Sequence, residues 1–109
     1  MIAADSDAGA ERLSTSLEQQ WVNLRRGTPG LLQPPVDTMD GRWSQAERAG
    51  VGHVLAYAVI GGPETVRQRL GALIEMTKAD ELIVATQIFD HAARLHSYEI
   101  VAGIRATLD

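Results

Sequence analysis

The stretch AYAVIGGPETVRQRLGALIEMTKADELIVAT, residues 56–86, decides the fold. Its apolar run at 56–60 shows no polar alternation, which is typical of a buried parallel strand. The Gly-Gly-Pro sequence at 61–63 ends this run, and Pro63 suits the first position of a helix because an N–H there would have no partner. A second apolar run follows at 81–86. We therefore predict two adjacent parallel strands joined by a helix that starts at Pro63. The buried face of that helix is predicted to contain Val66, Leu70, Leu73 and Ile74.

The segment before this stretch has the pattern of a strand end that is followed by a long helix. Residues 1–4 are apolar and lead directly into acidic residues. Ser6 or Asp7 can cap a helix that runs to about Arg26, and Gly27 suits the position just after its end. The apolar side chains at helical spacing, which predict its buried face, are Leu13, Leu17, Trp21 and Leu24.

The remaining segments predict one loop and two helices. Prolines and glycines exclude a helix from residues 28–42. Ser44 and Glu47 match a capping box that opens a short helix ending near Leu55. Asp90 can cap a last helix that runs to about residue 106. The apolar positions of this last helix are Leu95, Tyr98, Ile100, Val101, Ala102 and Ile104.

Strands that alternate with helices indicate an α/β fold with βα units around a parallel sheet. The 109 residues suit a single domain, and a net charge of -4 without a basic block argues against nucleic-acid binding. The absence of cysteine excludes disulfides and thiol chemistry. The apolar run at 54–60 is too short to span a membrane, and the first residues lack the pattern of a signal peptide. We expect a cytoplasmic protein that binds neither membranes nor nucleic acid.

Several stretches together resemble one family. They are AADSD at 3–7 with VNLRRG at 22–27, IGGPETV at 60–66 with Arg69 and Leu70, ADELIV at 79–84, FDHAARL at 89–95 and SYE at 97–99. In this order and at this separation, they are similar to the end of bacterial luciferase-like, flavin-dependent monooxygenases. The resemblance implies a partial (β/α)₈ TIM-type barrel, in which residues 1–109 form a single C-terminal segment. That segment would hold the last two βα units, preceded by a strand remnant and a helix.

The resemblance also implies a function. Such a monooxygenase oxidises an organic substrate with O₂ and reduced flavin. The resemblance therefore implies FMN as cofactor and a flavin reductase as partner. The sequence leaves open whether the cofactor is FMN or a deazaflavin. This chain alone is expected to be inactive. The alternative is a non-catalytic barrel fragment that self-associates or complements a missing half.

The candidate binding residues lie at strand ends and in the loop. Gly61 and Gly62 could bind the flavin phosphate at a helix start, or could form only a tight turn. Gln87 could hydrogen-bond the flavin, and Thr86 and Trp43 could contact the substrate. No catalytic residue can be assigned. The pair Asp90 and His91 could act as acid and base, but capping explains Asp90 alone and an exposed first turn explains His91, and we favour this second interpretation. The spacing of His53, His91 and His96 does not suit a metal, so no metal site is predicted.

The predicted strands are apolar on both faces, and helices are expected to cover only the outer face. The inner face would then need a partner, because fully exposing one Val, Leu or Ile side chain costs roughly 1.5–3 kcal/mol. We therefore expect a dimer or a higher oligomer. We also expect the isolated chain not to bind FMN tightly, because most loops at the carboxyl end of a barrel would be missing.

Overall fold

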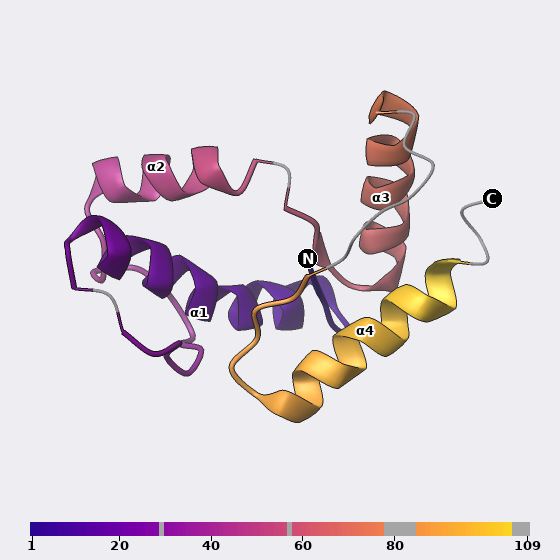
Figure 1. The fold of residues 1–109 in the computed structure, drawn as a ribbon, viewed down its shortest axis with the longest axis horizontal. Coiled ribbons are helices and arrows are strands. Elements are labelled where there is room, and N and C mark those ends of the chain that lie inside the picture. Colours follow the sequence, from indigo (N-terminus) through magenta and orange to yellow (C-terminus); the bar gives the residue numbers. More distant parts are fainter. Residues whose placement is uncertain (29, 57, 78–84, 106–109) are drawn as a thin grey trace.

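The computed structural model describes residues 1–28, 30–56, 58–77 and 85–105 (Figure 1). In order, the elements are β1 (Ile2–Ala3), α1 (Asp7–Arg25), α2 (Gln45–Val54), β2 (Ile60–Gly61), α3 (Pro63–Thr77) and α4 (His91–Arg105). None of the helices in this part of the chain combines the length and the hydropathy that a membrane span requires.

β1 and β2 form a parallel pair in which Ile2 lies opposite Ile60 and Ala3 opposite Gly61. The Ile2 N–H donates to the Val59 carbonyl at 2.8 Å. The predicted strand remnant at 1–4 is thus confirmed, and the apolar run at 56–60 provides its partner, although β2 begins only at Ile60.

The second predicted strand, at 81–86, falls mainly on 81–84, outside the described residues. Its described end, at 85 and 86, has no strand geometry. The predicted pairing of this strand with β2 therefore stays a prediction.

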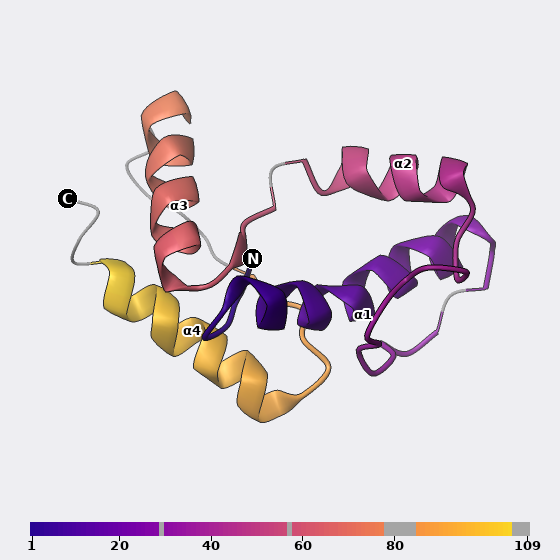
Figure 2. The same ribbon diagram turned by 180° about the vertical axis from the view of Figure 1, so that it is seen from behind.

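Helices cover both faces of the two-stranded sheet, as two opposite views show (Figures 1 and 2). Ile2 and Ile60 share one face, which packs against Ala10 and Leu13 of α1 and against Ile88. The residues of the opposite cluster are Ala3 and Val59 from the strands, Val66 and Leu70 from α3, and Ile104 from α4. The expectation that helices would cover only one face is therefore wrong, because α1 packs against one face while α3 and α4 pack against the other. Self-association stays a prediction, but an uncovered face of the sheet no longer supports it.

The helix ends follow the predicted capping residues. The Gly9 N–H donates to Ser6 Oγ at 3.0 Å at the start of α1. Gly27 follows the end of that helix with a φ of 76°, a conformation that glycine adopts without steric cost. The capping box of Ser44 and Glu47 is present at the start of α2. At the start of α4 the Ala93 N–H donates to Asp90 Oδ2 at 2.8 Å.

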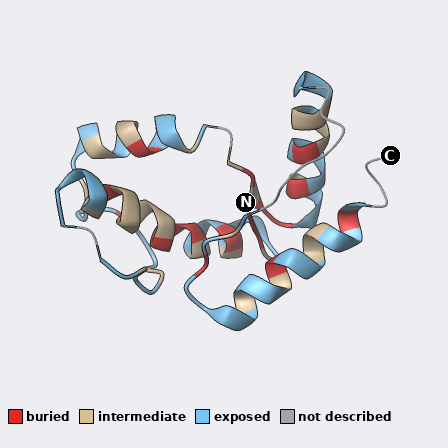
Figure 3. Cartoon of the chain, in the orientation of Figure 1, coloured by how far each residue is buried: buried red, intermediate tan, exposed pale blue. Residues whose placement is uncertain are grey.

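The predicted helix faces are only partly confirmed (Figure 3). Val66 and Leu70 of α3 are buried as predicted, whereas Leu24, Leu95 and Tyr98 are 52%, 49% and 39% exposed. The buried positions of α1 are instead mostly small: Ala10, Ser14, Thr15, Ser16 and Val22. The buried side chains of α1 are therefore not confined to the predicted apolar stripe, although Leu13 of that stripe packs against the core.

Candidate functional site

The turns that follow β1 and β2 meet at the carboxyl edge of the sheet. Asp7, in the first turn of α1, accepts the Gly62 N–H with Oδ1 at 2.7 Å. Its other oxygen, Oδ2, accepts the Thr65 hydroxyl at 3.0 Å. The bond from Gly62, followed by that from Thr65, lowers the pKa of Asp7. One carboxylate thus serves the starts of two helices, α1 and α3, where the helix dipoles favour negative charge.

Gly61 and Gly62 lie where these turns approach most closely. A Cβ on residue 61 would lie 2.6 Å from Thr65 Cγ2 and 2.9 Å from Asp7 Oδ1. A Cβ on residue 62 would lie 3.3 Å from the Ser6 backbone. Packing therefore explains both glycines, and an incoming phosphate would meet the Asp7 carboxylate on the Gly62 N–H. This geometry favours the tight-turn interpretation, and phosphate binding by the two glycines stays an untested prediction.

Gln87 lies beside a small cavity on one side of α1. The cavity has a volume of about 250 Å³, and its lining residues are Gln20, Trp21, Asn23, Leu24, Gly30, Leu31 and Gln87. It combines one indole ring with three side-chain amides. The neighbouring Thr86 hydroxyl is buried and has no hydrogen-bond partner among the described residues. A buried hydroxyl without a hydrogen-bond partner is uncommon, so the Thr86 hydroxyl is available to form a hydrogen bond with a further group.

Trp43 lies in a larger, open groove on another face of α1. The groove has a volume of about 590 Å³ and carries charged side chains of both signs. Among them is Glu18, whose pKa is raised mainly by burial. Arginines 12, 48 and 69 line the same groove. The groove residues of α1 and the cavity residues Gln20 and Leu24 fall on different sides of the helix. The structure therefore does not bring Trp43 and Gln87 into one site.

A segment that we call the strap, residues 34–37, reaches this groove with Asp37. α1 holds it at three successive points. Gln19 Nε2 donates to the Pro34 carbonyl at 3.0 Å, and the Val36 N–H donates to Thr15 Oγ1 at 2.9 Å. Arg12 Nε contacts an Asp37 carboxylate oxygen at 3.0 Å. These partners lie three and four residues apart on α1, so they share one face of the helix. The predicted long loop is thus fixed here.

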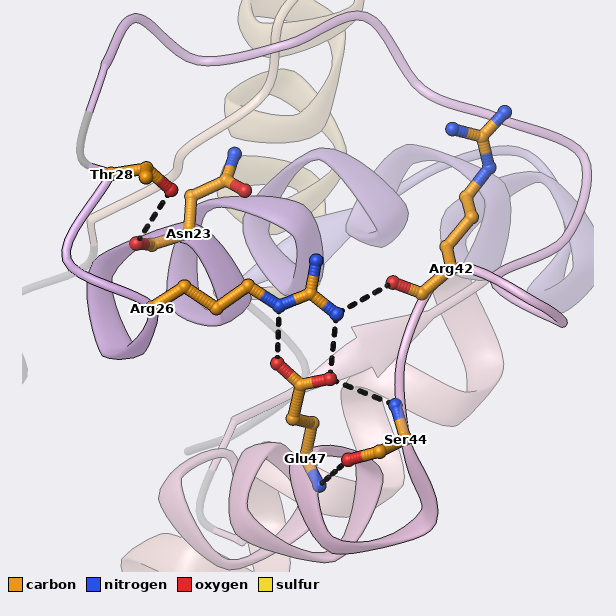
Figure 4. A network of polar contacts seen from close by, with 6 residues as sticks. All are labelled: Asn23, Arg26, Thr28, Arg42, Ser44 and Glu47. Carbon is orange, nitrogen blue, oxygen red and sulfur yellow. Dashed lines mark hydrogen bonds and ion pairs between the residues drawn. The ribbon is translucent and has the colours of Figure 1, made fainter.

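An ion pair closes the loop at its other end (Figure 4). Arg26 donates from Nε to Glu47 Oε2 at 2.6 Å and from Nη2 to Oε1 at 2.7 Å. Its Nη2 also donates to the Arg42 carbonyl at 3.3 Å, and the Ser44 N–H donates to Glu47 Oε1 at 2.8 Å. The Arg26 bonds, followed by the Ser44 N–H, lower the pKa of Glu47 to about 2. The network joins the end of α1 to the start of α2, a link that the sequence did not predict.

The histidines make separate pairwise contacts. His91 Nδ1 lies 2.6 Å from Arg94 Nη2, and His96 Nε2 lies 2.7 Å from Asp5 Oδ1. Asp90 caps α4 rather than facing His91 as a partner. Within the described ranges, no group of three or more histidine and acidic side chains could hold a metal ion.

The comparisons with known proteins agree with the resemblance seen in the sequence. No family model matches the chain. A protein named luciferase-like monooxygenase from Escherichia coli K12 is 45% identical over 108 residues, which are 99% of this chain and 32% of that protein. The chain corresponds to part of a luciferase-like protein. The Bacillus subtilis protein YvbT, named only as uncharacterized, is 43% identical over 95% of this chain and 31% of its own length.

A solved structure supports the same relationship. The crystal structure of apo-MsnO8 superposes with a TM-score of 0.70 over 95% of this chain and 32% of that one, at 25% identity. The chain therefore spans about a third of the length of the relatives that it matches.

The described residues do not by themselves make a flavin site. The Gly62 N–H is engaged by a carboxylate, which disfavours a phosphate there. The cavity beside Gln87, at about 250 Å³, falls below the roughly 300–1,000 Å³ usual for small-molecule pockets. The larger groove carries four carboxylates, from Glu11, Glu18, Asp37 and Asp40.

Proposed function

We propose that this chain is the C-terminal third of a flavin-dependent, luciferase-like monooxygenase. The observation that carries the proposal is 45% identity over 99% of the chain to a protein of that name. The complete protein would be a (β/α)₈ barrel that oxidises an organic substrate with O₂ and reduced FMN. A flavin reductase would supply the reduced cofactor, and the cytoplasm would be the site of the reaction.

The chain would supply part of the carboxyl face of that barrel. β1 and β2 are parallel, so their carboxyl ends share one edge. Active sites of such barrels lie at this face, on the loops that follow the strands. Thr86 and Gln87, at the end of the next predicted strand, are the groups that we propose for contact with flavin or substrate. The unpartnered Thr86 hydroxyl supports this assignment. Gly61, Gly62 and Asp7, at the carboxyl ends of β1 and β2, would belong to the same face of the barrel.

The second candidate function is a non-catalytic fragment that complements a missing half. The poor fit of the described cavities to flavin favours it. Both functions assign the same third of the barrel to this chain. They differ in whether a complete barrel that contains it binds flavin.

A chimera tests the proposal. The chain would replace the matched third of the Escherichia coli relative, and FMN binding would be followed by quenching of flavin fluorescence. We expect the chimera to bind FMN with a micromolar or tighter dissociation constant, and the isolated chain not to reach that affinity. A micromolar constant corresponds to about −8 kcal/mol.

A pair of glutamine variants in the chimera locates the site. Gln87→Ala should weaken FMN or substrate binding about tenfold, which corresponds to the loss of about one hydrogen bond. Gln33→Ala, in the exposed loop, is the matched control and should leave binding unchanged. A folded chimera without FMN binding would refute the monooxygenase proposal and leave the complementing fragment.

A further inference from the structure

Among the described residues, no charged side chain lines the small cavity beside Gln87. Four of its lining residues, 20, 21, 23 and 24, come from one stretch of α1. The others are Gly30 and Leu31 of the loop and Gln87 of the segment before α4. The larger groove on α1 differs, because it carries carboxylates and guanidinium groups. An ion would find no opposite charge in the small cavity, and its burial there would be costly. The cavity therefore favours an uncharged ligand.

Three side-chain amides of this cavity have unused hydrogen-bonding capacity. The side chains of Gln20, Asn23 and Gln87 make no hydrogen bond within the part of the chain that the structure describes. The bond from Thr28 in Figure 4 reaches the backbone carbonyl of Asn23 and not its amide. Gln19, next to Gln20 on α1, differs because its amide donates to the strap. Each amide contains a donor and an acceptor, so together they suit a ligand group that also has both.

Trp21 and two leucines provide the apolar part of the cavity. An indole ring favours offset-stacked or edge-to-face contact with another aromatic ring. Leu24 and Leu31 are exposed, so a bound ring would remove apolar surface from water. An apolar cavity of about 150 Å³ can hold benzene. The volume of about 250 Å³ therefore suits one ring with a small substituent, whereas the fused rings of a flavin need more room.

We propose that this cavity binds a small, uncharged aromatic molecule that carries an amide or a similar group with both a donor and an acceptor. The ring contacts the indole of Trp21, and the polar group bonds to the amide of Gln87. We assign this class of molecule as the organic substrate. That assignment rests on the proposed function, whereas the binding itself does not.

Benzamide is the probe, and tryptophan fluorescence is the readout. The chain has two tryptophans, so Trp43→Phe leaves Trp21 as the only one. We expect benzamide to change the emission of Trp21 with a dissociation constant of about 1 mM or lower. Trp21→Phe leaves only Trp43, which lines the larger groove, and its emission should not change. A response of Trp43 alone, or of neither tryptophan, would overturn the proposal.

Two analogues test the charge and the ring on the unmodified chain, so they do not depend on how well a variant folds. Benzoate replaces the amide with a carboxylate of nearly the same shape. Cyclohexanecarboxamide keeps the amide but lacks the aromatic ring. We expect each analogue to bind at least about tenfold more weakly than benzamide, measured by calorimetry, which corresponds to about 1.4 kcal/mol. An affinity equal to that of benzamide for either analogue would contradict the proposed ligand class.

Matched glutamine variants locate the polar contact. Gln87→Ala should raise the dissociation constant of benzamide about tenfold, because one hydrogen bond to the ligand is lost. Gln45→Ala is the control. Gln45 is the first residue of α2, lies outside the cavity and makes no side-chain hydrogen bond within the described residues. Its replacement should leave binding unchanged. Equal effects of the two replacements would show that the amide of Gln87 is not a ligand contact.

The chimera separates this site from the proposed function. Benzamide should bind to the FMN-loaded chimera without displacing FMN, because the cavity does not suit the flavin rings. Displacement of FMN by benzamide would overturn the proposed site. If the chain binds benzamide but the chimera does not bind FMN, the site is supported and the monooxygenase proposal fails. If the chimera binds FMN but neither protein binds benzamide, only the site is refuted.

Discussion

Replacing Gly61 by alanine tests whether close packing, rather than ligand binding, accounts for the Gly-Gly turn. The new Cβ would lie 2.6 Å from Thr65 Cγ2 and 2.7 Å from Thr65 Cβ, so rotation of the Thr65 side chain cannot relieve both contacts. The third close neighbour, at 2.9 Å, is Asp7 Oδ1, which already accepts the Gly62 N–H. The start of α3 must therefore shift away from α1.

Overpacking of this kind costs about 1–3 kcal/mol. We expect Gly61→Ala to lower the free energy of unfolding by that amount, measured by urea denaturation with circular dichroism. For a chain of this size, about 1 kcal/mol corresponds to a decrease of roughly 4–8 °C in Tm. Gly50→Ala, in α2, is the control: its Cβ would have no neighbour within 4 Å, and alanine favours a helix by up to about 1 kcal/mol over glycine. A Gly61→Ala variant as stable as the original chain would refute the packing argument.

Three further predictions each concern a single residue. Gly27→Ala should destabilise the chain by about 1–2 kcal/mol in the same denaturation assay, because its φ of 76° is unfavourable for a side chain; an unchanged midpoint would contradict this. His96 has its pKa raised mainly by its bond to Asp5, so its stabilising contribution should be full below pH 6.5 and disappear as the pH rises through the raised value. A denaturation midpoint measured against pH should show this loss, and His96→Gln should abolish that dependence. Glu47, with its pKa lowered from 4.5 to about 2 by Arg26, should stabilise the chain above pH 4.5 and lose that effect as the pH falls towards 2. Acid titration of Glu47→Gln should show a shallower loss of stability, and identical curves would argue against the ion pair.

The features that could be predicted from the sequence depend on neighbouring residues. Caps such as Ser6, Ser44 and Asp90 act within three residues of their own position, so local sequence specifies them. Pro63 marks the start of α3 for the same reason. The strand at 1–4 could also be recognised, because an apolar run that ends in a capping residue is a local signal.

Features that depend on distant residues could not be predicted. Periodicity identifies an apolar helix face but not whether another element covers it, so Leu95 and Tyr98 belong to the apolar positions of the last helix although they are exposed. The same limit applies to the candidate site. A Gly-Gly turn suits a phosphate or a close helix contact equally well, and only Asp7, 55 residues earlier, distinguishes them.

The sequence also left the partner of Arg26 undetermined. Arg26 suits a helix end because of its charge, and nothing within its own turn indicates that it binds Glu47, 21 residues later. Thr15 likewise lies outside the predicted apolar stripe of its helix, yet it is buried and bonded to the strap.

The fixation of the strap by α1 also determines where a protease can cut. Leu31 is 89% exposed, whereas the backbone at Pro34 and Val36 is bound to side chains of α1. Proteases need a segment that can leave the surface and adapt to their active site. A first cut is therefore expected near Leu31 rather than in the strap. The two resulting pieces would remain joined through the strap and the Arg26 pair, so a nicked chain would elute as one species until denatured.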